Sequence, residues 1–356
     1  MKLLIQPEDG VAPLLAAIKK ARTSVDIVIF RFDRADIESA LKAASKRGVQ
    51  VTALITYVNH GGAKSLRKLE MRLLDAGVTV TRTDDNLVRY HDKLLVVDRT
   101  VLHMLSFNFT HLDIDHSRAF GVVTRKHKIV QEALRLIAAD KDRSTYAAGL
   151  DSFVVSPANA RKQLLALIRR ARKELLIYDP SIGDTDMLKA LSERAKSGVD
   201  VRIIGALTKK RSQLTVRPLG GFRLHTRTIV RDRCEVFVGS QSLRKAELDS
   251  RREVGLIVTD KKVLAGVVNT FEADWGAKPG RDATQPTVRE LKQKVKATVK
   301  KLSPLDPMVK GAVDDVVSEK GNASLSTQDV KETVQKAVKE AVRERVLEIL
   351  NERAEV

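Results

Sequence analysis

The chain has 356 residues, of which 43% are hydrophobic and 31% charged, and this composition excludes a largely disordered protein. Its net charge of +19 predicts a polyanionic partner, which is nucleic acid, an anionic membrane surface or a phosphate-bearing substrate, although a basic surface that serves solubility alone is the simpler alternative. The single cysteine, Cys234, excludes an internal disulfide. With no run of ~20 apolar residues and no signal-peptide pattern, we expect a cytoplasmic protein, at most peripheral on a membrane.

Helix and strand patterns alternate from the start of the chain. Apolar spacing predicts amphipathic helices over Val11–Arg22 and Ala35–Arg47, and short apolar runs predict buried strands over Val25–Phe30 and Val49–Ile55. A third helix is predicted over Lys64–Ala76. Strands that alternate with helices favour an α/β sheet with helices on both faces.

A cluster of polar residues around His91 interrupts this apolar pattern. Side chains alternate along a strand, so His91 and Lys93 are expected on one face of a strand over Tyr90–Val97. Ser106 and Asn108 repeat the spacing at the end of the next strand. A histidine beside a fixed cation and two neutral donors suits the chemistry of a phosphate diester.

The same pattern occurs again 134 residues further on, counted from His91 to His225. The matching pairs are His91 and His225, Lys93 and Arg227, Asp98 and Asp232, Ser106 and Ser240, and Asn108 and Ser242. The preceding elements repeat as well, as helices over Ala160–Arg172 and Asp186–Lys196 and strands over Leu175–Tyr178 and Val199–Ile204. The helix predicted over Lys64–Ala76 has no counterpart in the second copy. Two copies around a pseudo-two-fold axis bring both histidines to one cleft.

The paired H-x-K/R-x4-D motifs, each followed by a serine-containing strand, resemble the phospholipase D superfamily, whose signature is H-x-K-x4-D followed by G-S-x-N. The resemblance covers residues 1–276 and implies a duplicated α/β sandwich, with repeats over 1–149 and 150–276. It also implies transfer of a phosphoryl or phosphatidyl group through a phosphohistidine, without a metal ion or other cofactor. The sequence departs from the signature at three positions, which are Arg227 for Lys, Ser242 for Asn, and Leu105 for Gly.

Two opposed histidines need different roles, because one attacks as a neutral imidazole while the other donates a proton. The resemblance implies that a carboxylate from the opposite repeat orients each ring. Glu253 is therefore expected to support His91, whereas His225 lacks a matching partner and has Asp113 or Asp115 as substitutes. Our hypothesis makes His91 the nucleophile and His225 the acid.

The remaining motif residues are assigned to phosphate binding or to support. Lys93 and Arg227 are expected to clamp the phosphate, together with four hydrogen-bonding residues, Ser106, Asn108, Ser240 and Ser242. Asp98 and Asp232 are expected to brace a turn rather than to touch substrate. A second repeat that has decayed is the alternative.

A separate cluster, His111, Asp113, Asp115 and His116, has a spacing that could supply metal ligands. A solvated turn is the simpler interpretation, and we predict no metal site.

The character of the chain changes after Trp275. Residues 277–286 form a linker rich in Gly and Pro, and residues 287–356 form a helical extension. Its patterns cover Thr287–Leu302, Met308–Ser318 and Ser326–Asn351. A helical cap and a surface for self-association or a partner are equally favoured.

Three functions are consistent with these features. A phosphodiesterase or phosphatidyltransferase acting on phospholipid is favoured by the two motifs in one chain. A nuclease of the same superfamily is the second, because the positive charge suits nucleic acid. The third is a catalytically weak phosphate-binding scaffold that assembles through its C-terminal helices.

Overall fold

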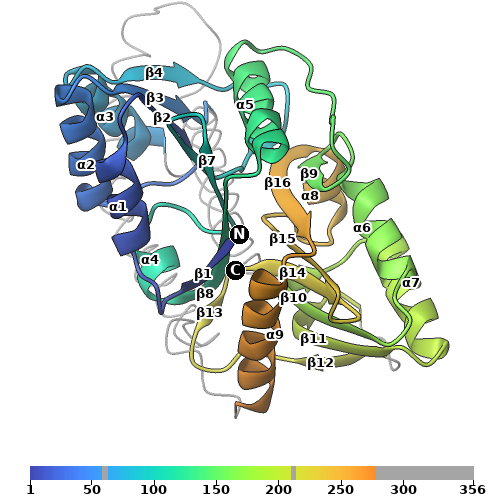
Figure 1. Cartoon of the computed structure of the whole chain (residues 1–356). Coiled ribbons are helices and arrows are strands. Elements are labelled where there is room, and N and C mark those ends of the chain that lie inside the picture. The colour runs from blue at the N-terminus through green and yellow to red at the C-terminus, as the bar shows by residue number, and fades with distance from the viewer. Residues whose placement is uncertain (58–62, 210–213, 278–356) are drawn as a thin grey trace, which may run out of the picture. The chain divides into compact units, whose positions relative to one another are not determined.

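Two eight-stranded sheets form the frame of the protein in this computed structural model, which describes residues 1–57, 63–209 and 214–277 (Figure 1). The strands of the first sheet are β1 (Lys2–Gln6), β2 (Ser24–Ile29), β3 (Gln50–Ile55), β4 (Thr79–Arg82), β6 (Leu94–Val97), β7 (Val101–Leu105), β8 (Ser117–Thr124) and β13 (Arg223–Leu224). They follow the order β1-β8-β7-β6-β2-β3-β4, with β13 paired to β8 outside this path.

The second sheet repeats this arrangement. Its strands are β5 (Arg89–Tyr90), β9 (Phe153–Ser156), β10 (Glu174–Ile182), β11 (Asp200–Leu207), β12 (Thr215–Arg217), β14 (Arg227–Arg231), β15 (Glu235–Gly239) and β16 (Arg251–Val258). Their order is β12-β11-β10-β14-β15-β16-β5, with β9 paired to β16. Read from its other end, this order matches that of the first sheet, with β16 in the place of β8 and with β9 and β5 paired to it as β1 and β13 are paired to β8.

The helices follow the same duplication. The first copy contains α1 (Ala12–Lys20), α2 (Ala35–Lys46), α3 (Ala63–Leu74), α4 (His111–Asp115) and α5 (His127–Lys141). The second contains α6 (Ala160–Arg169), α7 (Thr185–Lys196), α8 (Lys245–Asp249) and α9 (Lys261–Gly276). Among the described residues, α3 alone lacks a counterpart, so the duplicated α/β fold and its extra helix are confirmed. The repeat boundaries stay predictions, and the three C-terminal helical patterns lie outside the described residues.

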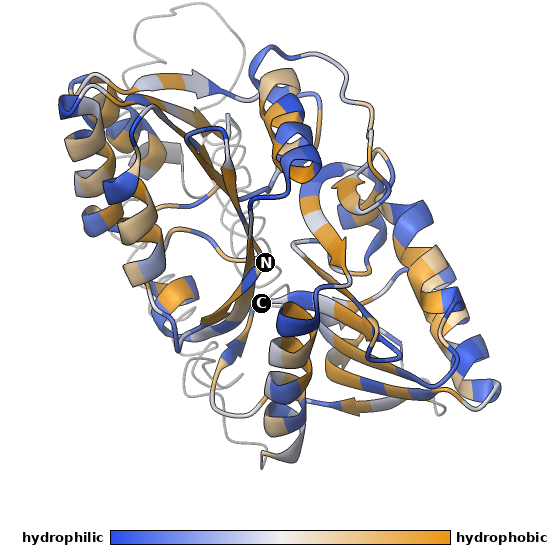
Figure 2. Ribbon diagram, in the orientation of Figure 1, coloured by the Kyte–Doolittle hydropathy of each residue, from blue (hydrophilic) through white to orange (hydrophobic). Residues whose placement is uncertain are grey.

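Three hydrophobic cores lie between the layers of helices and sheets. Helices α1, α2 and α3 bury Leu14, Leu41 and Leu69 against the outer face of the first sheet. Helices α6 and α7 cover the second sheet in the same way. The central core lies between the sheets and takes side chains from both of them and from α5 and α9. Figure 2 shows that the strands are mostly hydrophobic, whereas the covering helices also carry hydrophilic residues.

The two copies exchange a short strand each at the centre of the molecule. Strand β5 belongs to the first copy but pairs with β16 of the second, with Arg89 opposite Arg251. Strand β13 of the second copy pairs with β8 of the first, with Arg223 opposite Ser117. Because each motif histidine directly follows an exchanged strand, both are placed at the boundary between the copies.

The single strand predicted over Tyr90–Val97 is wrong. The backbone N–H of His91 donates to Arg252 of β16 at 2.8 Å, whereas the carbonyl of Lys93 accepts from Leu105 of β7 at 3.1 Å. The chain thus passes from one sheet to the other at this point. The reason is that residue alternation reports the faces of a strand but not its pairing partner, so a change of sheet leaves the apolar pattern unbroken.

Candidate active site

His91 is held by a carboxylate from the opposite repeat. Its Nδ1 lies 2.8 Å from Oε2 and 3.0 Å from Oε1 of Glu253, which is fully buried on β16. The ring of Phe30 packs edge-on against the imidazole, with centroids 4.5 Å apart. These contacts fix the ring and engage Nδ1, so Nε2 is the nitrogen left for chemistry. The pairing of His91 with Glu253 is the one expected from the sequence.

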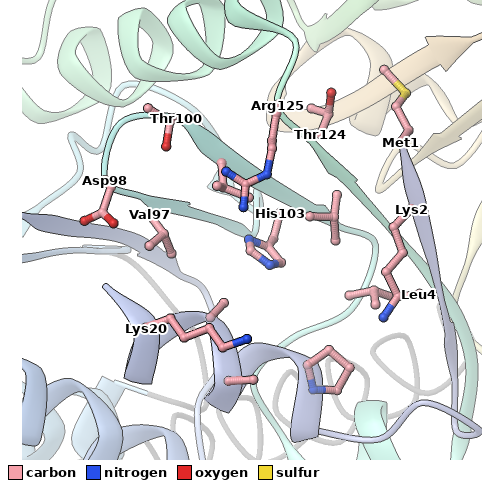
Figure 3. A pocket seen from close by; sticks show the side chains of 15 residues that line it. Met1, Lys2, Leu4, Lys20, Val97, Asp98, Thr100, His103, Thr124 and Arg125 are labelled. Atoms are coloured by element: carbon pink, nitrogen blue, oxygen red, sulfur yellow. The ribbon is translucent and has the colours of Figure 1, made fainter. Parts of the chain in front are cut away.

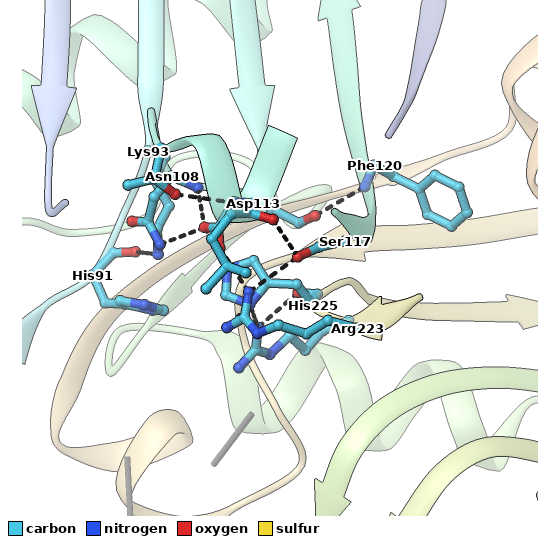
Figure 4. A network of polar contacts seen from close by, with 12 residues as sticks. His91, Lys93, Asn108, Asp113, Ser117, Phe120, Arg223 and His225 are labelled. Carbon is cyan, nitrogen blue, oxygen red and sulfur yellow. Dashed lines mark hydrogen bonds and ion pairs between the residues drawn. The ribbon is translucent and has the colours of Figure 1, made fainter. Parts of the chain in front are cut away.

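His225 also meets a carboxylate of the opposite repeat, Asp113, but through Nε2 and not through Nδ1 (Figure 4). Its Nε2 lies 3.0 Å from Oδ2 of Asp113, a buried residue of α4. The backbone N–H and the side-chain amide of Asn108 both donate to this same oxygen at 2.7 Å. The other carboxylate oxygen of Asp113 accepts from Arg223 at 2.7 Å. Of the two aspartates that the sequence offered as partners of His225, Asp113 is therefore the one that contacts it.

The second candidate, Asp115, faces away from this network. Its carboxylate binds Arg34 at 2.7 Å and lies 2.9 Å from Nδ1 of His111. The members of the possible metal cluster thus diverge, because Asp113 contacts His225 while Asp115 and His111 contact Arg34. Within the described ranges, no group of three or more His, Cys, Asp and Glu side chains is placed to hold a metal ion.

Lys93 and Arg227 occupy matching positions beside the two histidines. The amine of Lys93 donates to the backbone carbonyl of His91, and Arg227 donates to that of His225 at 2.7 Å. Nη1 of Arg227 also lies 3.4 Å from Nδ1 of His225, so the guanidinium stays within the site. Both side chains are almost completely buried. The substitution of Lys by Arg in the second motif therefore keeps a cation at the same place.

The motif serines contact protein groups rather than standing free. The hydroxyl of Ser106 accepts from the backbone N–H of Phe120 at 3.0 Å, and Ser240 accepts likewise from Val254 at 3.1 Å. Ser242 donates its hydroxyl proton to the buried Asp179. These bonds connect the motifs to β8, β10 and β16. Direct phosphate binding by Ser106, Asn108, Ser240 and Ser242 stays a prediction.

Asp98 and Asp232 brace turns on the outside of the sheets. Asp98 accepts from three successive backbone N–H groups, at Arg22, Thr23 and Ser24. Asp232 accepts from the equivalent groups of Arg172, Lys173 and Glu174. The bonds agree with the supporting role expected for both residues.

Burial and charge give the two histidine–carboxylate pairs different electrostatics. Burial raises the pKa of Glu253 to about 8, and burial together with Lys93 lowers the pKa of His91 well below its usual value. Burial lowers the pKa of His225 to about 3, with Arg223 acting in the same direction. Burial raises the pKa of Asp113, but His225 and Arg223 outweigh it and hold this pKa well below its usual value. His225 is therefore neutral and lies between an ionised carboxylate and two arginines.

Three contributors to the site escaped the sequence analysis, namely Phe30, Asp179 and Arg223. Arg223 matches Arg89 at the same spacing of 134 residues that relates the histidines, and each residue opens the exchanged strand before its motif. That match was the signal available for Arg223. Phe30 corresponds to Pro180 in the second copy, so no repeated residue pointed to it.

In this protein each motif histidine contacts a carboxylate across two copies of one α/β fold. This arrangement places the protein in the class of the phospholipase D superfamily. The family model described as "Cardiolipin synthase, PLD-like domain" matches residues 14–141 and 164–275. The chain belongs to this family.

The chain is also similar to two kinds of known protein. Mitochondrial cardiolipin hydrolase of Homo sapiens is 30% identical over 128 residues, which are 35% of this chain and 48% of that protein, so the chain spans about half the length of the curated relatives it matches. Polyphosphate kinase of Porphyromonas gingivalis aligns with a TM-score of 0.64 at 20% identity, covering 79% of this chain and 53% of that one. Phosphatidylserine synthase of Haemophilus influenzae aligns at 0.60 and 12%, covering 85% and 93%. At these identities the two structures show the shared fold alone.

Proposed function

We propose that the protein is a phosphodiester hydrolase or phosphatidyltransferase that acts on phospholipid through a covalent phosphohistidine, without a metal ion. The observation that carries the proposal is the pair of cross-repeat contacts, Glu253 to His91 and Asp113 to His225, within one buried basic site. Each motif histidine takes its carboxylate from the other copy, so the duplication is what makes the site.

In the first step, Nε2 of His91 attacks phosphorus, and the bond from phosphorus to the leaving oxygen breaks. Glu253 acts in its ionised form, in which it accepts a hydrogen bond from Nδ1 of His91 and stabilises the positive charge that develops on the imidazole, and His225 donates a proton to the leaving alkoxide. Lys93 and Arg227 stabilise the charge on the non-bridging oxygens. In the second step, water or an alcohol attacks the phosphohistidine, His225 takes up its proton, and Nε2 of His91 leaves.

His225 needs a proton before it can act as the acid, yet burial, together with Arg223 and Arg227, lowers its pKa and keeps it neutral near pH 7. A bound phosphodiester carries a negative charge that offsets Arg223 and Arg227 and therefore raises the pKa of the ring. Substrate binding and protonation of His225 are thus coupled, which ties the acid form to the occupied site.

Two comparisons support phospholipid as the substrate. The description of the matching family model names cardiolipin synthase, and the matched curated relatives are named cardiolipin hydrolases. The net charge of +19 suits an anionic membrane surface. None of the helices in the described part of the chain has the length and apolarity that crossing a bilayer requires. We therefore propose a cytoplasmic protein that meets lipid at the surface of the membrane.

The same charge also favours nucleic acid, which makes a nuclease the second candidate. A substrate panel in EDTA separates the two, with phosphatidylglycerol and cardiolipin vesicles in one arm and single- and double-stranded DNA and RNA in the other. Lipid turnover that disappears in His91→Asn supports the proposal. Nicking of nucleic acid that disappears in the same variant supports the nuclease. Salt-sensitive binding with no turnover in either arm supports a scaffold, and a requirement for added metal contradicts the proposed mechanism.

Anion binding is expected to weaken as the pH rises, because burial lowers the pKa of the Lys93 amine to about 7. Above that pH the amine of Lys93 is neutral, so the binding of an anionic ligand requires the amine to take up a proton. The inhibition constant of a non-hydrolysable phosphonate monoester should rise between pH 7 and 9, approaching tenfold per pH unit.

Lys93→Arg is the matched control, since Arg keeps its charge throughout this range and already stands at the equivalent position in the second motif. The inhibition constant of the variant should rise much less over this range, because only the ionisation of Glu253, whose pKa burial raises to about 8, remains to weaken anion binding. An unchanged affinity of the wild-type protein between pH 6 and 9 would contradict the assignment of Lys93 as the titrating clamp.

A further inference from the structure

A second pocket lies on the outer face of the first sheet, away from the motif histidines (Figure 3). It has a volume of about 620 Å³ and is lined by residues of β1, α1, β6, β7 and β8 and of the segments that follow β6 and β8. Its apolar lining includes Leu4, Ala17 and Val123. None of the histidines, carboxylates or cations that contact one another in the candidate active site lines it.

Three cations around this pocket lack an acidic partner. Lys2, Lys20 and Arg125 line it, and none of them forms an ion pair within the described part of the chain. The carboxylate in the lining, Asp98, is already engaged by backbone N–H groups of residues 22–24. In Figure 3, Lys20 and Arg125 extend towards His103 from opposite sides. The pocket therefore gathers positive charge that the protein itself leaves uncompensated.

His103 supplies an unpartnered acceptor at the same place. It is 4% exposed, and its Nδ1 makes no hydrogen bond. Burial lowers the pKa of His103 to about 4, although a hydrogen bond with the backbone of Leu95 opposes this shift. The ring is therefore neutral near pH 7, and with its other nitrogen donating to the backbone, Nδ1 offers a lone pair. A buried acceptor beside uncompensated cations suits a ligand that brings both negative charge and a hydroxyl donor.

The second repeat provides an internal comparison, because its equivalent pocket lacks these features. That pocket has a volume of about 340 Å³. Ser152 and Thr259 stand where the first repeat has Lys2 and Arg125, and Phe237 stands where it has His103. Its lining holds two cationic side chains, Lys126 and Arg170, together with two carboxylates, Asp151 and Glu235, and Arg170 is paired with Glu235 at 2.9 Å. The unbalanced charge is thus specific to the first repeat and does not follow from the fold.

We propose that this pocket binds a phosphate monoester with an apolar portion. The ionised oxygens of the ligand meet Lys2, Lys20 and Arg125. Below the ligand's second pKa of about 6 the monoanion predominates, and its P–OH donates to Nδ1 of His103. The apolar portion lies on Leu4 and Ala17. This site is independent of the proposed catalytic function.

The test uses the full chain carrying Lys93→Ala, which weakens phosphate binding at the catalytic site, and phenyl phosphate as the calorimetric probe. We expect one bound phenyl phosphate. Adding Lys2→Ser and Arg125→Thr, the residues of the second repeat, should weaken it at least about tenfold, because two charge-assisted contacts are lost. The same pair of changes in the otherwise wild-type protein should leave phosphodiester turnover unchanged. Equal affinity with and without the pair would overturn the proposal.

Three further arms test the chemistry of the ligand. At pH 5.5 phenyl phosphate is mainly a monoanion and His103 is neutral, so phenyl sulfate differs from it by the missing hydroxyl donor and should bind more weakly. Inorganic phosphate, which has no apolar portion, should also bind more weakly. Dihexanoyl phosphatidic acid should bind more tightly than phenyl phosphate if the natural source is a lipid, and no more tightly if it is a soluble metabolite. His103→Phe, which copies Phe237, should abolish binding while the melting temperature shows that the variant is folded. Retained binding in that variant would exclude the role of the imidazole.

Discussion

Replacement of His91 by Asn is expected to lower kcat/KM for a phosphodiester substrate by at least about a thousandfold, because it removes the proposed nucleophile. The structure favours this assignment, since Glu253 engages Nδ1 and leaves Nε2 for attack on phosphorus. Asn is close to His in size and polarity, so the fold should be retained. Steady-state kinetics with a soluble diester provide the measurement.

A change of leaving group separates the two histidines. A nitrophenolate leaves without protonation, so His225→Asn should lose much less activity towards a nitrophenyl diester than towards an alkyl diester. His91→Asn should be equally inactive towards both, because attack on phosphorus is needed in each case. Full rescue of His91→Asn by the nitrophenyl substrate would reverse the roles of nucleophile and acid.

Replacement of Arg252 by Met is expected to destabilise the protein by about 3 to 5 kcal/mol, because a buried carboxylate loses its cation. Arg252 is 6% exposed and contacts the buried Asp140 through Nε at 3.1 Å and Nη2 at 2.9 Å. Burial, with Asp92 acting in the same direction, raises the pKa of Asp140 to about 7 even with the arginine present. Urea unfolding at pH 7.5, followed by circular dichroism, gives the free energy of unfolding.

The destabilisation should depend on pH with a definite sign. A carboxyl group whose pKa is raised on folding binds more protons in the folded state, so it costs stability as the pH rises from about 4 through 7. The loss in Arg252→Met should therefore be smaller at pH 5.5 than at pH 7.5. Arg170→Met is the control, because its pair with Glu235 is 56% exposed on the arginine side and is expected to contribute no more than about 1 kcal/mol. Equal losses in the two variants would contradict this account of the central ion pair.

The duplication was predictable because identical spacings recur without reference to any contact. The spacing from His91 to His225 also relates Asp98 to Asp232 and Ser106 to Ser240, and the structure gives each of these pairs matching bonds. The extra helix of the first copy followed from the same comparison. Such features depend on the order of residues along the chain, which the sequence displays directly.

Partners that come from opposite copies were harder to predict. Asp113 and Asp115 are two residues apart, and only the packing of α4 against the exchanged strand β13 decides which of them reaches His225. The change of sheet between His91 and Lys93 was missed for a related reason, because it alters backbone pairing while the side chains stay buried. Contacts between the copies are a property of the assembled sheets and leave little trace in local patterns.

The central claim is that His91 forms a covalent bond to phosphorus while His225 serves as the acid across the same site. The most direct measurement is a reaction quenched with alkali, in which a P–N bond survives, followed by mass spectrometry of the peptides. The account predicts a phosphorus adduct on the peptide that contains His91, and none in His91→Asn. An adduct that persists in His91→Asn, or that resides on His225 in the wild-type protein, would contradict it.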